Sequence, residues 1–406
     1  MHDFHTFEVA VAVLGGLLVV GSLLAGVAQR SFLSLTAIFV VAGFVLGEGG
    51  LEVLDVDPES GFVRSLAIVA LILILFRDGL EVEQELLQEE WHLPLRKLVF
   101  AMPLTAALVA VVTHALTDLD WTESFLLGAL LSPTDPVLSS AVVTNARVPR
   151  RIRHSLNLES GLNDGLALPA VLALLFSLDP GEDGFTWWTF VVQDIGVGFL
   201  AGAVVGFAAA RLMPQRRALG IEISPHQKAL FGLGVAFSAY AVAVLPPEGN
   251  GLIAVFVAAI VLGILRPDIR EAFERRSEDI LEVVKLGIFV VFGAVLTAEG
   301  LFHDGAAAVA IALFTLFAAR PIAVHVSLAG SDTSADERWF MSWFGPKGVA
   351  TMTFSLLVLG QAIENGGRLL NIAALTVLFS IVLHGATELA GVNWIARRSG
   401  AAKASQ

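Results

Sequence analysis

The stretch LSPTDPVLSS at residues 131–140 places Asp135 between two prolines, Pro133 and Pro136, in the middle of a long apolar region. Each proline removes a backbone N–H donor and interrupts the i to i−4 hydrogen bonds of a helix. The freed carbonyl oxygens have no partner in hydrocarbon, so such a break is tolerated only where it is buried in protein or lines a cavity. The stretch therefore predicts an interrupted helix with two oxygen ligands for a hard monovalent cation, the Asp135 carboxylate and the Thr134 hydroxyl.

The composition is that of a membrane protein. Of the 406 residues 56% are hydrophobic and 16% are charged, whereas soluble domains are nearer a half apolar and a quarter charged. The chain has no cysteine, which excludes disulfides and cysteine-based metal sites. No G-x-G-x-x-G follows a strand, and we expect neither a cofactor nor a nucleic-acid partner. The net charge of −13 says less than the distribution of charge over the loops.

Thirteen apolar stretches approach the roughly 20 residues that span a bilayer: 7–29, 32–47, 62–80, 98–117, 121–144, 155–178, 186–211, 228–246, 250–266, 281–298, 305–328, 338–361 and 369–395. Lys and Arg, including Arg96 and Lys97, gather in alternate connections, which lie inside if the N-terminus is outside. We expect an all-α polytopic protein of the plasma membrane with a cytoplasmic C-terminus and no soluble regulatory domain. Two inside segments, 81–92 and 267–280, predict short interfacial helices.

An odd number of helices permits two inverted six-helix repeats, as is common in secondary transporters. Helices 1–6 over about 7–178 and helices 8–13 over about 228–395 form the repeats, and helix 7 over about 186–211 links them. Helix 12, the counterpart of interrupted helix 5, carries FGPKGV at 344–349. There an ammonium group, that of Lys347, can neutralise the exposed carbonyl ends of half-helices. Matching interruptions in corresponding helices predict a transport site.

A second group of polar residues opens helix 6, which reads SLNLESGLNDGLALP at 155–169. Glu159 and Asn163 share one helix face, and Asp164 lies one position further round. At about 1.5 Å per residue, we expect Asp164 near the bilayer midplane, at the depth of three other charges, which are Asp135, Arg320 and Lys347. Ionisable groups at that depth usually face a pathway or one another.

Static ion pairs are the simplest interpretation of these charges, Glu159 with Arg320 and Asp135 with Lys347. For Glu159 and Arg320 we favour a static pair, because a guanidinium is always charged. By count, two bases near the midplane offset only two of the three acids. The third acid, Asp164, is then either protonated or holds a cation, which is the alternation that a cation/proton exchanger requires.

The chain resembles the NhaP-type monovalent cation:proton antiporters in four motifs, TDP at 134–136, ESGLND at 159–164, ARP at 319–321 and GPKG at 345–348. Helix number, orientation and motif order fit over nearly the whole chain. The resemblance implies a transporter and not an enzyme. It implies a homodimer with a dimerisation domain and a mobile six-helix core domain, exchanging Na⁺ or Li⁺ for H⁺ by an elevator-like movement.

The same resemblance implies roles for particular residues. It implies that the ion site is lined by Thr134, Asp135, Ser160 and Asp164, with Asn163 beside them, and that Glu159 and Arg320 form the structural charge pair. The Asn163-Asp164 dipeptide implies electroneutral one-for-one exchange, in contrast to Asp-Asp relatives.

Two positions depart from the family pattern. Where relatives often read LFEGGL, this chain reads LFRDGL, with Arg77 beside Asp78, so the contribution of the usual acid is open. Where many relatives have GPRG, Lys347 stands, which keeps the charge but not the bidentate geometry of arginine. Of the other intramembrane polar residues, we expect Asp194 and His384 to be satisfied core groups, and His154 and His325 to lie near the inside ends, where they can tune the pH response.

Three alternatives belong to other functions. A K⁺/H⁺ antiporter of related fold is the nearest, weakened by the missing nucleotide-sensing domain. A channel is disfavoured because no repeated TVGYG-type filter occurs. An aspartyl intramembrane protease would need a GxGD motif and would leave Glu159, Arg320 and Lys347 without roles.

Overall fold

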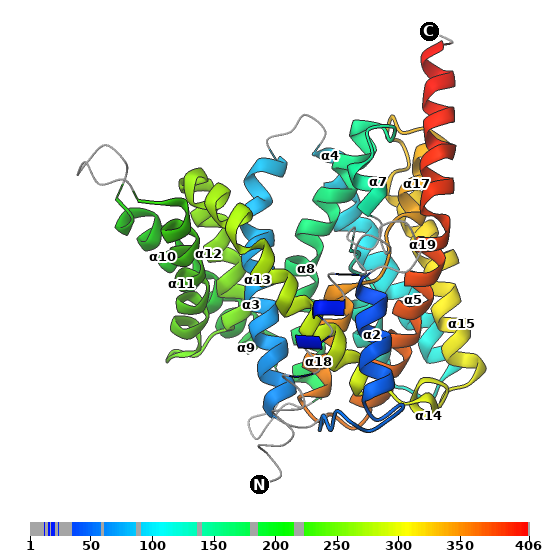
Figure 1. Ribbon diagram of the computed structural model, residues 1–406, viewed down its shortest axis with the longest axis horizontal. Coiled ribbons are helices and arrows are strands. Elements are labelled where there is room, and N and C mark those ends of the chain that lie inside the picture. Colours follow the sequence, from blue (N-terminus) through cyan, green and yellow to red (C-terminus); the bar gives the residue numbers. More distant parts are fainter. Residues whose placement is uncertain are drawn as a thin grey trace. The chain divides into compact units, whose positions relative to one another are not determined.

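The computed structural model describes residues 35–57, 61–86, 91–135, 140–178, 186–214 and 223–404, with seven isolated positions between 12 and 23. Over those residues the regular elements are helices and no strand occurs (Figure 1). The first predicted span, 7–29, lies outside the described residues apart from the isolated positions. The chain divides into two compact units. The first comprises residues 1–67, 92–160 and 285–406, and the second comprises 68–91 and 161–284.

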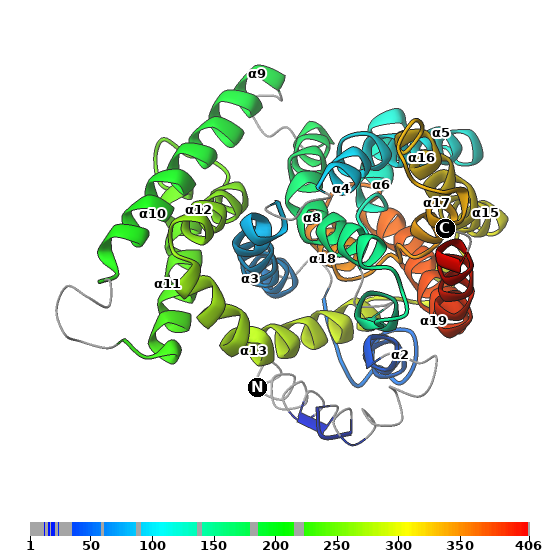
Figure 2. The same ribbon diagram turned by 90° about the horizontal axis from the view of Figure 1, so that it is seen from above.

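The first unit combines helices from three separate stretches of the chain, one of them the interior stretch 92–160 (Figure 2). Two long helices each contain a π-helical turn: α4 (His92–Arg96) continues through η1 (Lys97–Ala101) into α5 (Met102–Leu116), and α15 (Ala306–Phe314) continues through η4 (Thr315–Ala319) into α16 (Arg320–Ser327). The other helices are α2 (Leu35–Leu46), α6 (Trp121–Leu130), α7 (Ser140–Thr144), α14 (Ala298–Leu301), α17 (Ala335–Trp343), α18 (Val349–Leu359) and α19 (Gly366–Ala404).

The second unit contains a tightly packed group of three helices, α10 (Gly198–Leu212), α11 (Pro225–Val244) and α12 (Gly251–Leu265). α9 (Trp187–Thr189) and the π-helix η3 (Phe190–Val197) lead directly into α10. Three helices contribute residues to both units, namely α3 (Gly61–Leu86), α8 (Arg150–Leu178) and α13 (Pro267–Ala294).

Both interrupted helices of the first unit begin with the same capping device. The Asp120 side chain accepts the N–H of Glu123, and the Glu123 carboxylate accepts the N–H of Asp120, which starts α6. Ser334 and Glu337 make the equivalent capping box at the start of α17. A capping box satisfies two backbone donors that a helix start otherwise leaves open, so the entry of each half-helix is fixed before the chain reaches its break.

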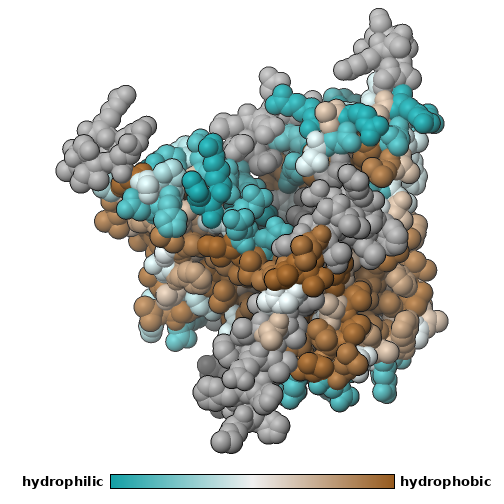
Figure 3. Space-filling model, in the orientation of Figure 1, coloured by the Kyte–Doolittle hydropathy of each residue, from teal (hydrophilic) through white to brown (hydrophobic). Residues whose placement is uncertain are grey.

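Each predicted span from 32 onwards contains helical residues of the structure, and the spans 121–144 and 338–361 each contain two separate helices. By length and composition, six of the described helices can cross a membrane, and a seventh span arises if α12 and α13, bent by 119°, are taken together. In Figure 3 the surface over α15 and α19 is hydrophobic between hydrophilic ends. The protein is therefore an all-helical, multi-pass membrane protein, while the number thirteen and the inverted repeat stay predictions.

One local prediction is wrong. Residues 267–280 do not form a separate interfacial helix, because α13 runs without interruption over 28 residues from Pro267 to Ala294. Pro267 is the first residue of this helix, a position where its missing N–H costs nothing. The charged segment and the apolar segment thus belong to one continuous helix, and the chain bends by 119° between α12 and α13.

Candidate functional site

Two helix breaks meet in the first unit and are joined through their backbones. α6 ends at Leu130, and the chain is non-helical at Pro133, Thr134 and Asp135. α17 ends at Trp343 and α18 begins at Val349. The N–H of Asp135 donates to the carbonyl oxygen of Pro346 at 2.8 Å. The two non-helical segments therefore satisfy some of the polar groups that the breaks expose.

The Asp135 carboxylate lies at the N-terminus of α18. Its Oδ2 accepts the N–H of Val349, the first residue of that helix, at 3.1 Å. An acidic group there is stabilised by the positive end of the helix dipole. The side chain of Asp135 is buried, so its charge is held by the backbone of the partner half-helix.

The two non-helical segments and the helix ends beside them are called the crossing below. Lys347 contacts the crossing at the C-terminal end of α6. Its Nζ donates to the carbonyl oxygens of Ser132 and Pro133, at 3.2 and 3.1 Å, just after the end of α6. The residue is fully buried. A cation at the C-terminal end of a helix compensates the negative end of its dipole, so the two half-helices have an acid at the positive end of one and a base at the negative end of the other.

The two glycines of GPKG allow charged side chains to approach the backbone. A Cβ on Gly348 would lie 2.5 Å from Asp135 Oδ2. A Cβ on Gly345 would collide with the guanidinium of Arg320. Real Cβ contacts do not reach such distances, so positions 345 and 348 must be glycine for Arg320 and Asp135 to occupy their places.

Two side chains of α19 form hydrogen bonds with the backbone of the break between α17 and α18. His384 Nε2 lies 2.8 Å from the carbonyl oxygen of Trp343, and Ser380 Oγ accepts the N–H of Lys347 at 2.8 Å. Nδ1 lies 2.8 Å from the carbonyl oxygen of Ser380 and 3.1 Å from its hydroxyl. Both ring nitrogens therefore face a carbonyl oxygen, and a neutral imidazole donates to one of the two. His384 is thus a buried, hydrogen-bonded group that bridges the last residue of α17 and the break.

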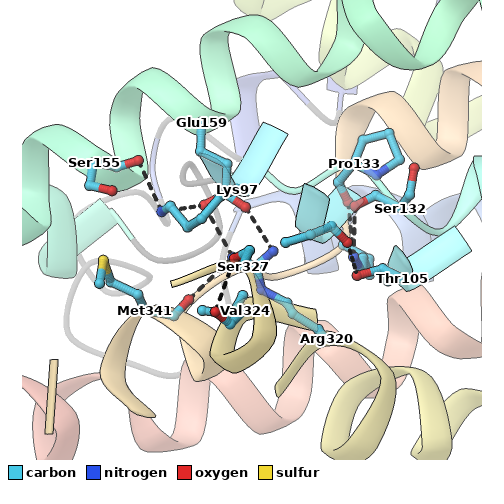
Figure 4. A network of polar contacts seen from close by, with 12 residues as sticks. Lys97, Thr105, Ser132, Pro133, Ser155, Glu159, Arg320, Val324, Ser327 and Met341 are labelled. Atoms are coloured by element: carbon cyan, nitrogen blue, oxygen red, sulfur yellow. Dashed lines mark hydrogen bonds and ion pairs between the residues drawn. The ribbon is translucent and has the colours of Figure 1, made fainter. Parts of the chain in front are cut away.

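A cluster of three charges lies next to this crossing (Figure 4). Arg320, the first residue of α16, donates from Nη1 to Glu159 Oε1 at 2.8 Å and from Nη2 to Glu159 Oε2 at 3.3 Å. Lys97 Nζ donates to the same carboxylate, at Oε2, at 2.7 Å and to the carbonyl oxygen of Ser155 at 3.1 Å. Arg320 also donates to the carbonyl oxygen of Met341 in α17. The cluster therefore ties four helical segments together, which are η1, α8, α16 and α17.

Lys97 is the functional residue that the sequence analysis missed. The sequence predicts a place for Lys97 in an inside connection, but η1 places it in the protein interior with a fully buried side chain. The count of two bases near the midplane is therefore incomplete, because a third base, Lys97, is buried beside Glu159. A usable signal was present, since a lysine directly before a long apolar run can belong to the helix.

The remaining predicted ion ligands are placed in both units. Thr134 and Asp135 are buried and Ser160 is partly buried, all in the first unit. Asn163 and Asp164 are buried residues of the second unit, on the same continuous helix α8 as Glu159. The structure thus brings together the breaks and the charge cluster within the first unit, and the complete ion site stays a prediction.

Arg77, which departs from the family pattern, forms an ion pair with its neighbour Asp78 in the second unit. Arg77 Nη2 and Nε donate to Asp78 Oδ1 at 2.8 and 3.0 Å. Asp78 is buried, and Glu81 lies 3.8 Å from the same guanidinium. The arginine that replaces the usual acid therefore has its own acidic neighbours.

An all-helical membrane protein with two crossing helix breaks and buried charges at the crossing has the architecture of a secondary transporter. Residues 16–389 match the model of the family described as sodium/hydrogen exchanger, transmembrane. The chain belongs to the sodium/hydrogen exchanger family, and its resemblance to NhaP-type antiporters is confirmed.

Individual relatives are distant. The K(+)/H(+) antiporter NhaP2 of Shewanella sp. (strain MR-4) is 24% identical over 382 residues, which cover 92% of this chain and 65% of that protein. The Na(+)/H(+) antiporter 1 of Methanocaldococcus jannaschii is 24% identical over 375 residues, covering 89% and 85%. The solved structure of the sodium proton antiporter MjNhaP1 from M. jannaschii at pH 8 has a TM-score of 0.80 at 19% identity, with 96% and 99% of the two chains covered. The chain spans about two thirds of the length of the first K(+)/H(+) relatives, and the structural likeness establishes the fold.

Proposed function

We propose that the protein is a secondary antiporter that exchanges a monovalent cation, Na⁺ or Li⁺, for a proton. The observation that carries the proposal is the crossing of the two breaks, where Asp135 lies at the start of α18 and Lys347 covers the end of α6. Such a crossing compensates two half-helix dipoles inside the protein. It leaves oxygen ligands in a buried, polar place where a desolvated cation can bind.

Asp164 is the proposed carrier, on which Na⁺ and H⁺ compete. Asp135, Thr134, Ser160 and Asn163 are the other proposed residues of the ion site, and the Asn163-Asp164 dipeptide supports electroneutral 1:1 exchange. Glu159 is unsuited to carry the ion, because its two oxygens already accept from Lys97 and Arg320. The charge of Glu159 serves the scaffold, so a titrating acid must be found elsewhere.

Potassium is the second candidate cation. The relatives from Shewanella and Alkalimonas amylolytica are named K(+)/H(+) antiporters, whereas the one from Methanocaldococcus is named a Na(+)/H(+) antiporter. Lys347, in place of the arginine of many relatives, is a further reason to test both ions. We also propose a homodimer in the plasma membrane, with the N-terminus outside and the C-terminus in the cytoplasm.

The test is proton flux in proteoliposomes with Na⁺, Li⁺ and K⁺ in turn, with and without a clamped membrane potential. We expect exchange with Na⁺ or Li⁺ and the same rate at both potentials. Asp164→Asn should retain less than a tenth of the turnover, a barrier increase of at least about 1.4 kcal/mol. Asp194→Asn, which removes an acid in a predicted span outside the proposed site, should retain activity. Full activity in Asp164→Asn would refute the assignment of the carrier, and flux with K⁺ alone would refute the choice of sodium.

A further inference from the structure

An aromatic groove lies between α17 and α19 in the first unit. It has a volume of about 420 Å³, within the usual range of small-molecule sites, and tryptophan and phenylalanine make up most of its lining. Phe340 and Phe344 form a buried floor, and Trp339 and Trp394 are 57% and 36% exposed at its edges. The groove is therefore concave, apolar and open to the surroundings of the helices.

The groove presents almost no hydrogen-bonding groups. The indole N–H of Trp343 donates to the Thr387 hydroxyl at 2.9 Å, and that hydroxyl donates to the carbonyl oxygen of Leu383. The other lining side chains are hydrocarbon or aromatic, apart from the indole N–H groups of Trp339 and Trp394. A ligand that fills the groove must hence be apolar over most of its length.

One end of the groove is rimmed by arginine. On α19, Ala390, Gly391 and Trp394 line the groove, and Arg397 and Arg398 follow Trp394 by three and four residues, on the same helix face. Arg398 Nη1 lies 3.6 Å from Asp336 Oδ2 in the first turn of α17, so this side chain leans across the end of the groove. Both partners are well exposed, and such a pair is weak, which leaves the guanidinium able to take another anion.

The position along the helices matches the boundary of a membrane. The groove lies where the apolar parts of α17 and α19 give way to charged residues, Asp336 and Glu337 on one helix and Arg397 and Arg398 on the other. Tryptophan is enriched at that depth. A belt of single tryptophans would need no cavity, whereas here the rings enclose one.

We propose that this groove binds one anionic phospholipid of the leaflet that faces the C-terminal end of α19. An acyl chain lies against the aromatic walls, and Arg397 and Arg398 bind the phosphate, whose negative charge is not offset by a cationic headgroup. Guanidinium groups suit this role because they form paired hydrogen bonds with phosphate oxygens. The proposal stands on the groove and its rim alone and does not depend on which ion the protein transports.

The occupant also touches the break. Phe344, part of the groove floor, directly follows the last residue of α17 and begins the non-helical segment before Lys347. A Cβ on Gly391 would lie 2.2 Å from the ring of Phe344, so the floor already packs tightly on α19. A lipid in the groove would consequently contact Phe344, a side chain at the start of the break.

The test is lipid retention by the full-length protein, measured by native mass spectrometry with phosphatidylglycerol and phosphatidylcholine of identical chains. We expect at least tenfold tighter retention of phosphatidylglycerol. The variant with both Arg397→Ala and Arg398→Ala should lose that preference, while Arg211→Ala, which removes an exposed basic residue at the end of α10, should keep it. Equal retention of the two lipids by the wild type would overturn the proposal.

A second pair of variants tests the groove itself. Ala390→Trp fills it and should reduce retention of both lipids about tenfold. Leu389→Trp adds the same ring on the opposite, exposed face of α19 and should leave retention unchanged. If Ala390→Trp instead changed the oligomeric mass and left lipid retention intact, the groove would be a contact between two copies of the chain and the proposal would be wrong.

Discussion

Lys97 Nζ lies 2.7 Å from Glu159 Oε2 in the interior of the first unit, on the carboxylate that Arg320 also contacts. One acid therefore balances two bases. Removing a base leaves the acid with one partner, whereas removing the acid leaves two buried cations unpaired. The three residues are consequently unequal in what they contribute to stability.

Glu159→Gln should destabilise the protein more than Lys97→Met. The first change creates uncompensated buried charge, which costs about 3–5 kcal/mol. The second loses mainly one hydrogen bond to a charged group, worth about 1.5–3 kcal/mol. Thermal denaturation of the purified variants measures both. A larger loss in Lys97→Met than in Glu159→Gln would contradict this account of the cluster.

The contact between Gly348 and Asp135 predicts a loss of transport without a loss of charge. In Gly348→Ala the new Cβ must displace the Asp135 carboxylate from a distance of 2.5 Å. A shift of about 1 Å at a functional site can cost a hundredfold in rate, and we expect a loss of that order in cation-driven proton flux. Gly367→Ala, where a Cβ meets nothing within 4 Å, is the matched control. Equal flux in the two variants would show that the position of Asp135 is unimportant.

His384 predicts a pattern of rescue. His384→Leu removes the imidazole beside the carbonyl oxygen of Trp343, which still accepts the N–H of Gly345, and the loss of one such hydrogen bond costs about 0.5–1.5 kcal/mol. His384→Gln can still donate from its amide and should recover most of the lost melting temperature and flux. If leucine and glutamine behaved alike, the hydrogen bond to Trp343 would not be what matters.

The break motifs were readable from the sequence because their physics is local. Two prolines around Thr134 and Asp135, and glycines on both sides of Pro346 and Lys347, disfavour a regular helix locally, and the described chain is non-helical at 133–135 and 344–348. A single proline is a weaker signal, since Pro169 lies inside α8. The burial of Lys97 could not be predicted from local sequence in this way. Its burial depends on α4 beginning at His92, ahead of the apolar run, and on the π-helical turn η1, which aims the side chain at α8. Likewise, whether 267–280 ends before the next span or continues into it depends on packing, which periodicity does not report.

Arg368 and two aspartates of the first unit form a group of ion pairs whose contribution to stability should depend on pH. Arg368, in the first turn of α19, donates to Asp304 Oδ2 at 2.9 Å and to Asp118 Oδ1, in the loop before α6, at 2.6 Å. The hydrogen bond from Arg368 lowers the pKa of Asp118 below its ordinary value. Because the folded state has the lower pKa, the stabilisation is present above the ordinary aspartate pKa of about 3.9 and is lost as the pH falls through the folded value.

The difference in melting temperature between the wild type and Asp118→Asn should therefore be present at pH 6 and should shrink below about pH 4. In an Arg368→Gln background the same difference should be near zero at both pH values, because the partner is gone. A difference that is unchanged at acid pH would show that the pair does not link folding to protonation.

The last prediction follows from the proposal that Na⁺ and H⁺ share Asp164. If one carboxylate binds either ion, a proton excludes sodium, and the apparent sodium Km should rise about tenfold for each pH unit below the value at which Asp164 titrates, then flatten above it. For exchange near neutrality that value must lie close to the working pH, as for any group that both binds and releases a proton. The maximal rate at saturating sodium should change much less from the sodium-loading side. Activity then falls in acid through competition and in alkali through lack of protons, and a bell-shaped profile arises without a separate sensor.

Measuring the sodium Km from about pH 5 to 9 on both faces of the membrane tests this directly. A constant Km with a varying maximal rate would reject the shared site and point to a distinct pH sensor, for which His325, with Nδ1 at 2.8 Å from the carbonyl oxygen of Pro321 and its ring against Trp339, is the first residue to replace.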